Sequence, residues 1–190
     1  MSTVLFFGSF NPFHNAHYKI ARFVIENQLA DNLWFIVSPH NPLKDTDILI
    51  DSNHRLKMLN LIVNKHSEFQ VCDIEYHLSL PSFTVNTLKK LKELYPQINF
   101  DILIGSDSLD QIHLWKDYRF ILEHYKLLVF PRQNNYKIPQ QYCQYNIILL
   151  NTDVITLSST FIREKAKKKE DISELIPECI YKYMKINSLM

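Results

Sequence analysis

Short, almost wholly apolar runs that alternate with amphipathic segments constrain the fold of this 190-residue chain more than any other feature. A strand that is apolar on both faces is typical of a parallel sheet, because helices cover such a sheet on both sides. The runs expected to form strands are residues 4–7, 33–37, 70–74, 100–104, 126–130 and 146–150. The sequence therefore predicts an α/β fold: a Rossmann-like, doubly wound, mainly parallel sheet with right-handed crossovers and helices on both faces.

The segments between these runs show helical spacing and residues typical of helix ends. Asp51 or Ser52 can cap one helix, Ser158 or Ser159 opens another, and Pro177 is well placed to open the last. The expected helices cover about residues 14–28, 52–63, 84–94, 160–168 and 177–184, with a short one capped by Ser106 or Asp107. No linker or repeat interrupts the pattern, so residues 1–190 are expected to form a single domain with a C-terminal helical part at about 158–190.

Composition and charge exclude several classes of protein. Lys plus Arg total 21 and Asp plus Glu total 20, which argues against a globally basic nucleic-acid binder. Cys72, Cys143 and Cys179 are far apart and share no metal-ligand spacing, so neither a disulfide framework nor a cysteine zinc site is expected. With no signal peptide and no apolar run of about 18 residues, the sequence predicts a cytoplasmic protein with no membrane or nucleic-acid partner. It allows a homo-oligomer.

The chain contains only 2 glycines, where average usage would give about 13. Gly8 ends the first apolar run, and Gly105 follows the run at residues 100–104. In a doubly wound sheet, ligands bind beyond the carboxyl ends of the strands, where the strand order reverses. We therefore expect the backbone at these glycines to approach a ligand closely.

The segment from Gly8 to His17 carries the first candidate ligand-binding residues. Backbone amides at the start of a helix, together with His14 and His17, would form an anion site. Two imidazoles beside phosphate oxygens can stabilise charge that develops on phosphorus. The alternative is structural: His14 caps the turn and His17 packs in the core. Zinc is not expected, because no third or fourth ligand lies nearby in the sequence.

A second anion site is expected at the start of the helix near residue 158. The hydroxyls of Ser158, Ser159 and Thr160 lie at this helix start. Arg163, one turn later, can bind phosphate through two N–H groups. The alternative is an ordinary hydroxyl cap with an exposed arginine.

Three further residues could bind parts of a nucleotide. Asp107 could accept hydrogen bonds from ribose hydroxyls, Trp115 could stack on a flat ring, and Lys44 could bind phosphate. Each has a structural alternative: helix capping for Asp107, core packing for Trp115 and a solvated side chain for Lys44.

Taken together, these residues resemble the nucleotidylyltransferase α/β-phosphodiesterase superfamily. Its signature is an (H/T)xGH element after the first strand and a later (I/L)SSTxxR element, which here read HNAH at residues 14–17 and LSSTFIR at residues 157–163. The two elements in this order in one chain are far more specific than either alone. Within the superfamily, the chain is similar to the bacterial nicotinate-nucleotide adenylyltransferases essentially from end to end.

Further segments carry this resemblance. They are SPHNPLK at residues 38–44, SFTVNTL at 82–88, GSDSL at 105–109 with WK at 115–116, VFPR at 129–132 and IPECIY at 176–181. The chain departs from the family pattern at Asn11 and Asn86, where Asp is usual, and at Ala16, where Gly is usual. One glycine is also missing before Gly8. None of these departures removes a group assigned here to phosphate chemistry.

The resemblance implies transfer of an adenylyl group from ATP to nicotinate mononucleotide, giving deamido-NAD and pyrophosphate in NAD biosynthesis. Mg²⁺ would arrive bound to ATP, with no dedicated metal site in the protein. The resemblance implies catalytic roles for His14, His17 and Arg163. It further implies that ATP is bound by Gly8, Ser9, Phe10, His14, His17, Gly105, Asp107, Ser158, Ser159, Thr160 and Arg163, and nicotinate mononucleotide by Lys44, Thr84 and Trp115.

Two other functions stay open from the sequence. The same chemistry could act on another acceptor, such as nicotinamide mononucleotide or phosphopantetheine, or could transfer a cytidylyl group. A chain with this sheet could also be a non-catalytic nucleotide-binding module, although such a module would not need both histidines and the Ser-Ser-Thr element.

Overall fold

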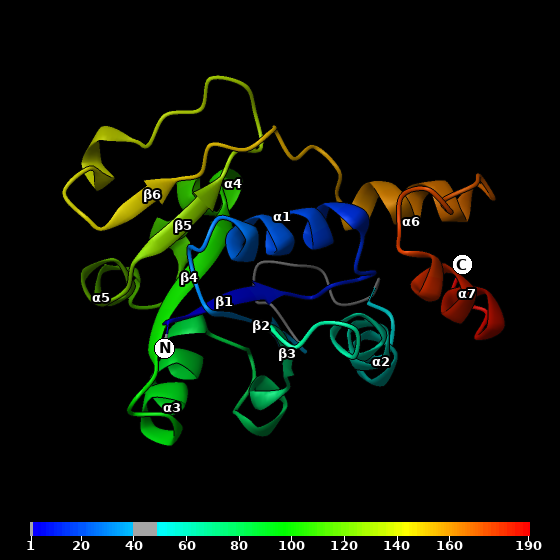
Figure 1. The fold of residues 1–190 in the computed structure, drawn as a ribbon, viewed down its shortest axis with the longest axis horizontal. Helices are drawn as coiled ribbons and strands as arrows, with labels where there is room; N and C mark the ends of the chain where they lie inside the picture. The colour runs from blue at the N-terminus through cyan, green and yellow to red at the C-terminus, as the bar shows by residue number, and fades with distance from the viewer. Residues whose placement is uncertain (1, 40–48) are drawn as a thin grey trace.

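A computed structural model describes residues 2–39 and 49–190 of the chain. The strands in this part of the chain form one parallel 6-stranded sheet in the order β3-β2-β1-β4-β5-β6 (Figure 1). They are β1 (Ser2–Gly8), β2 (Asn32–Val37), β3 (Phe69–Cys72), β4 (Asn99–Gly105), β5 (Leu127–Phe130) and β6 (Ile147–Leu149). The predicted α/β class with a doubly wound parallel sheet is therefore confirmed.

Helices occupy most of the connections between the strands. They are α1 (Asn15–Glu26), α2 (Ser52–Val63), α3 (Thr84–Leu94), α4 (Ser106–Asp110), α5 (Tyr118–His124), α6 (Ser159–Lys167) and α7 (Glu178–Ile186). Short 3-10 helices lie at η1 (Ile74–His77), η2 (Ile112–Leu114) and η3 (Gln140–Tyr142). None of the described helices is long and apolar enough to cross a membrane.

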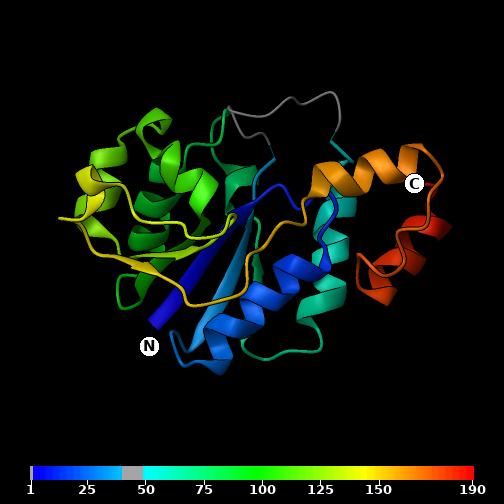
Figure 2. The ribbon, with the colours of Figure 1, turned by 90° about the horizontal axis from the view of Figure 1, so that it is seen from above.

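The strands are buried on both faces because helices cover both. Along β1, Val4 and Phe6 pack into a core that includes side chains of α1, α2, α6 and α7. Leu5 points the other way, into a second core with side chains of α3, α4 and α5. In β2, Phe35 packs into the first core and Trp34 packs into the second. Figure 2 shows the sheet between these two groups of helices.

The C-terminal helices complete the first core. Ile162 of α6 and Ile180 of α7 are fully buried in it, and α7 packs against α2. At the start of α1, the backbone N–H of Asn15 donates to Leu175 O at 3.0 Å, and its side-chain Nδ2 donates to Glu174 O at 2.8 Å. These contacts fix the C-terminal part of the chain beside the beginning of α1.

The strand order reverses between β1 and β4. β1 pairs with β2 on one side and with β4 on the other, and the sheet extends from this pair to both edges. Gly8 is the last residue of β1 and Gly105 is the last residue of β4. Both glycines therefore lie where a doubly wound sheet forms its ligand-binding crevice.

Two elements differ from the expectation because side chains find partners elsewhere in the fold. The strand expected at 70–74 ends at Cys72, and Ile74 is buried within η1 instead. Neither Ser106 nor Asp107 caps α4, which begins at Ser106 without a side-chain cap. Both residues interact with Arg132: Ser106 Oγ accepts a hydrogen bond from the Arg132 backbone N–H at 2.9 Å, and Asp107 Oδ2 lies 3.6 Å from Arg132 Nε.

The helix α5 was not expected from the sequence. No side chain caps its start, and the preceding residue, Asp117, has a left-handed backbone with φ of 53°. Asp117 is a residue type that often caps helices, but its side chain forms no cap here and the seven-residue helix is too short to show a clear helical spacing in the sequence. By contrast, Pro177 directly precedes α7, and Ser158 caps α6, both as predicted.

Glu75 in η1 is a buried carboxyl group. The residue is 2% exposed, and its Oε1 accepts a hydrogen bond from Thr87 Oγ1 at 2.8 Å. Burial raises the pKa of Glu75, and the nearby hydroxyls of Thr87, Ser38 and Ser82 offset this shift only in part. No well-aligned hydrogen bond from a described residue reaches Oε2. The ionised form of Glu75 is therefore unfavourable in the folded protein.

We expect Glu75→Gln to flatten the pH dependence of stability. Below the ordinary carboxyl pKa of 4.5, Glu75 is neutral in both the folded and the unfolded chain, so its favourable form is fully present. As the pH rises through the raised pKa of Glu75 in the folded protein, the free energy of unfolding of the wild type falls. The fall is about 1.4 kcal/mol for each unit by which folding raises this pKa. Urea unfolding at pH 5 and pH 8 measures this loss, with exposed Glu123→Gln as the control. An equal loss in the wild type and Glu75→Gln would contradict this account.

Candidate active site

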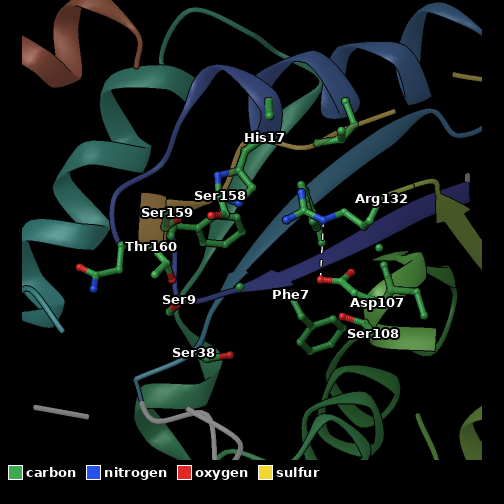
Figure 3. A pocket seen from close by; sticks show the side chains of 18 of the residues that line it. Phe7, Ser9, His17, Ser38, Asp107, Ser108, Arg132, Ser158, Ser159 and Thr160 are labelled. Atoms are coloured by element: carbon green, nitrogen blue, oxygen red, sulfur yellow. Dashed lines mark ion pairs between the residues drawn. The ribbon is translucent and has the colours of Figure 1, made fainter. Parts of the chain in front are cut away.

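A cavity of about 560 Å³ lies beyond the carboxyl ends of β1 and β4. The starts of α1 and α6 contribute to its lining, together with residues 82–84 and 114–116. Figure 3 shows Ser158 and Thr160 on one side of the cavity and Asp107 and Ser108 on the opposite side. Segments far apart in the sequence therefore meet at the point where the strand order reverses.

The structure brings the predicted site residues together, apart from one that lies outside the described residues. Lys44 is that residue, and its predicted role at a phosphate stays a prediction. The predicted residues that line the cavity are Gly8, Ser9, Phe10, His14, His17, Thr84, Gly105, Asp107, Trp115, Ser158, Ser159, Thr160 and Arg163.

His14 and His17 form a reciprocal cap at the start of α1. The Nδ1 of His14 accepts from the backbone N–H of His17 at 3.4 Å, and the Nδ1 of His17 accepts from the backbone N–H of His14 at 3.3 Å. Each accepting Nδ1 carries no proton, so the proton of each neutral ring is on Nε2. The two interpretations of this pair thus apply together: His14 caps the turn, and both rings also line the cavity.

His14 is uncharged at neutral pH. The residue is 2% exposed, and burial, assisted by the positive charge of Arg132, lowers its pKa to about 3. Its ring is stacked on that of His17, with centroids 3.6 Å apart, a geometry that disfavours two positive charges. The ring of His17 is enclosed further by edge or tilted contacts with Phe6, Phe10 and Phe13. The pair therefore offers N–H donors to an anion rather than two cations.

The hydroxyls at the start of α6 have different partners. Ser158 Oγ accepts from the backbone N–H of Phe161 at 3.2 Å, which satisfies one amide of the first turn. Ser159 Oγ donates to Pro12 O at 3.0 Å and so ties α6 to the loop after β1. Thr160 Oγ1 accepts from Arg163 Nη2 at 3.2 Å. The hydroxyls therefore hold the helix start in place as well as lining the cavity.

Arg163 is less available to an anion than its sequence position suggests. Its Nη1 donates to Asn11 O at 2.8 Å, and its Nε is buried without a hydrogen-bond partner among the described residues. Burial lowers the pKa of Arg163. Part of the guanidinium binds the loop after β1 and Thr160 in this structure, so only its remaining N–H groups could bind phosphate without an exchange of partners.

Neighbouring side chains lie close to the Cα atoms of both glycines. A Cβ atom on Gly8 would lie 2.9 Å from the Phe10 ring, and one on Gly105 would lie 2.3 Å from Asp107 Oδ1. Phe10 folds back over Gly8 with a left-handed φ of 46°. The expected close approach of this backbone to a ligand stays a prediction, and the structure adds a close approach of the protein's own side chains.

Arg132 is the main residue of the cavity that the sequence reasoning did not assign. It follows β5, and its Nη1 donates to Leu157 O at 3.1 Å while its Nε lies 3.6 Å from Asp107 Oδ2. The VFPR segment placed Arg132 in the resemblance, and its position after a strand next to β4 was the available signal. Lys116, which lies over the Phe83 ring at 4.9 Å, was also unassigned.

The described residues contain no group of three or more His, Cys, Asp or Glu side chains that could hold a metal ion. The three cysteines are not paired with one another. The lining of the cavity offers N–H donors, hydroxyls and guanidinium groups, which are the groups that bind anions.

Comparisons with known proteins agree with this geometry. The pattern that defines the cytidylyltransferase-like family matches residues 5–165. A probable nicotinate-nucleotide adenylyltransferase of Flavobacterium psychrophilum is 39% identical, over 97% of this chain and 96% of its own length. One from Azobacteroides pseudotrichonymphae is 40% identical over 90% of each chain.

Solved structures show the same fold. The nicotinic acid mononucleotide adenylyltransferase of Plasmodium falciparum, in complex with NaAD, superposes with a TM-score of 0.84 at 22% sequence identity, covering 99% of this chain and 96% of that one. The sequence relatives span nearly the whole chain at well above 30% identity. The chain therefore belongs to the cytidylyltransferase-like family and, within it, to the nicotinate-nucleotide adenylyltransferases.

Proposed function

We propose that this protein transfers the adenylyl group of ATP to nicotinate mononucleotide, producing deamido-NAD and pyrophosphate. One observation carries the proposal. The histidine pair of α1, the hydroxyls of α6, residues 82–84 and Trp115 all line the same cavity. The names of the sequence relatives, probable nicotinate-nucleotide adenylyltransferases, support the same acceptor. The cavity and its donors suit two phosphate-bearing substrates that must be aligned.

The proposed reaction is one in-line displacement at phosphorus. A phosphate oxygen of nicotinate mononucleotide attacks the α-phosphorus of ATP, a new P–O bond forms, and the bond to the β-phosphate oxygen breaks. Pyrophosphate leaves with the electron pair. The attacking phosphate is already an anion at neutral pH, so the protein needs no strong general base. Its task is to position both substrates and to stabilise the charge that develops.

The ATP phosphates are proposed to lie between the starts of α1 and α6. The Nε2–H groups of His14 and His17 can donate to phosphate oxygens, with His17 nearest the α-phosphoryl group. Ser158 and Ser159 at the start of α6, together with nearby backbone amides, suit the β- and γ-phosphates. Arg132 and Arg163 supply positive charge at the same cavity. Mg²⁺ would enter as part of the ATP complex and would supply positive charge that offsets the negative charge of the phosphates.

Adenosine and the acceptor are proposed to occupy the remaining walls of the cavity. Gly8, Ser9 and Phe10 would meet the adenosine, with Gly105 and Asp107 near its ribose. Thr84 lies at the start of α3, where backbone amides can bind the pyridine carboxylate, and Trp115 offers an indole ring for stacking. We also propose a cytoplasmic location, because ATP is abundant there and unpaired cysteines suit a reducing compartment.

Acceptor choice tests the proposed function directly. We expect rapid pyrophosphate release from ATP and Mg²⁺ with nicotinate mononucleotide, and much slower release with nicotinamide mononucleotide. Preference for the amide would retain the phosphate site and overturn the assignment of the acceptor. Folded protein that binds ATP but releases no pyrophosphate with any acceptor would favour the non-catalytic nucleotide-binding module.

His17→Ala should lower kcat by about 10²–10³-fold, because it removes one N–H donor to the transition state. Steady-state pyrophosphate release measures the change. His54→Ala is the matched control, since His54 bonds Tyr183 on the C-terminal helix at 2.6 Å and does not line the cavity. A folded His17→Ala protein with kcat like that of the control would rule out this role.

Trp115→Ala should raise the KM for nicotinate mononucleotide about tenfold, which corresponds to the loss of one aromatic stacking contact, and leave the KM for ATP almost unchanged. Trp115→Phe keeps a stacking ring and should stay close to the wild type. Initial rates with each substrate varied in turn separate the two KM values. A parallel rise in both would assign Trp115 to the fold of the cavity wall instead of to the acceptor.

A further inference from the structure

Arg55, in the first turns of α2, is a buried cation whose guanidinium hydrogen bonds within the described part of the chain all go to backbone carbonyl groups. The residue is 2% exposed and is among the largest fully buried side chains in the described part of the chain. Its Nη1 donates to Ser38 O at 2.7 Å and to Ser9 O at 2.9 Å. Its Nε donates to Ile50 O at 3.0 Å, and its Nη2 donates to Pro39 O at 3.3 Å.

These carbonyl groups come from three separate segments. Ser9 follows β1, Ser38 and Pro39 follow β2, and Ile50 precedes α2. Ile50 is held from its other side too, because its N–H donates to Asn11 Oδ1 at 3.0 Å. One side chain therefore joins the ends of two central strands to the segment that leads into α2.

Ser9 and Ser38 face the cavity, whereas Arg55 lies behind them and is not among its lining residues. Ser9 belongs to the loop proposed to meet ATP. Ser38 follows β2 and lines the cavity together with Thr84, which is proposed to meet the acceptor at the start of α3. Figure 3 shows Ser9 and Ser38 on the same part of the cavity wall. Arg55 thus links the Ser9 segment and the Ser38 segment through their backbone carbonyl groups.

Stability alone is a poor explanation for this arrangement. No carboxylate of a described residue forms an ion pair with Arg55, and burial lowers its pKa, so the charge is costly to bury. Replacing a buried charged group by a well-packed apolar one is often neutral or stabilising. A guanidinium, unlike an ammonium, offers donors in a rigid fork that can hold several carbonyl groups at fixed separations.

We propose that Arg55 is a positioning residue that sets the spacing between the Ser9 and Ser38 segments and thereby aligns the two substrates. This inference rests on the proposed function, because alignment matters only if two substrates react in the cavity. In-line displacement is sensitive to distance, and a misplacement of about 1 Å can lower the rate about 10²-fold.

The test compares Arg55→Met and Arg55→Lys with Leu59→Ala, a substitution of a fully buried residue on the same helix that does not line the cavity. We expect both Arg55 variants to lower kcat at least tenfold, with smaller changes in either KM. Leu59→Ala should lower Tm and leave kcat within twofold of the wild type. Full activity in Arg55→Lys would show that a positive charge is needed at this position and that the planar guanidinium is not. Arg55→Met with kcat like that of Leu59→Ala would overturn the proposal.

A second measurement does not depend on turnover. The Ser38 N–H donates to Gly8 O at 3.0 Å, and Arg55 holds the carbonyl of the same residue. Amide hydrogen exchange at Ser38 should be about tenfold faster in the Arg55 variants than in Leu59→Ala. Unchanged exchange would overturn the link between Arg55 and the cavity wall. A wild-type protein that is inactive with every acceptor, while exchange responds as expected, would refute the proposed function and leave this backbone link standing.

Discussion

Parallel pairing of β1 with both β2 and β4 is the constraint on which the rest of the molecule depends. Because the sheet extends in both directions from this pair, β1 and β4 end side by side while the helices that follow them, α1 and α4, cover opposite faces. A crevice therefore opens between their starts. The C-terminal segment fills the remaining side: α6 enters the first core through Ile162 and is tied to the loop after β1 by Ser159.

Burial decides where positive charge lies in this cavity. The His17 ring contacts aromatic side chains, and His14, stacked on it, stays neutral because water cannot solvate its charged form. Positive charge is supplied by Arg132 and Arg163, each of which binds backbone oxygens in this structure. Arg55 lies deeper, where it organises carbonyl groups instead of meeting a ligand. The N–H groups proposed to bind phosphate and the cations that hold the cavity walls are thus largely different groups.

Much of the fold and most candidate site residues could be predicted, for identifiable reasons. The strands carry apolar residues on both faces, and α6 and α7 begin next to a serine cap and a proline. The helix start that was predicted wrongly depends on a partner far away in the sequence. Ser106 and Asp107 do not cap α4 because Arg132, which follows another strand, interacts with both. The glycines marked the strand ends that border the cavity, but the close contacts of Phe10 and Asp107 with them could not be predicted from the sequence.

The sequence by itself determined the α/β class, the edge of the sheet that carries the site and the residue types that line it, because these follow from local spacing and from the rule that parallel strands end together. Tertiary structure decided the ionisation and partners of those residues. The neutrality of His14, the engagement of Arg163 with Asn11 and the four carbonyl partners of Arg55 all depend on burial and on contacts between distant segments. Desolvation is a property of the packed molecule, and no pattern along the chain encodes it directly.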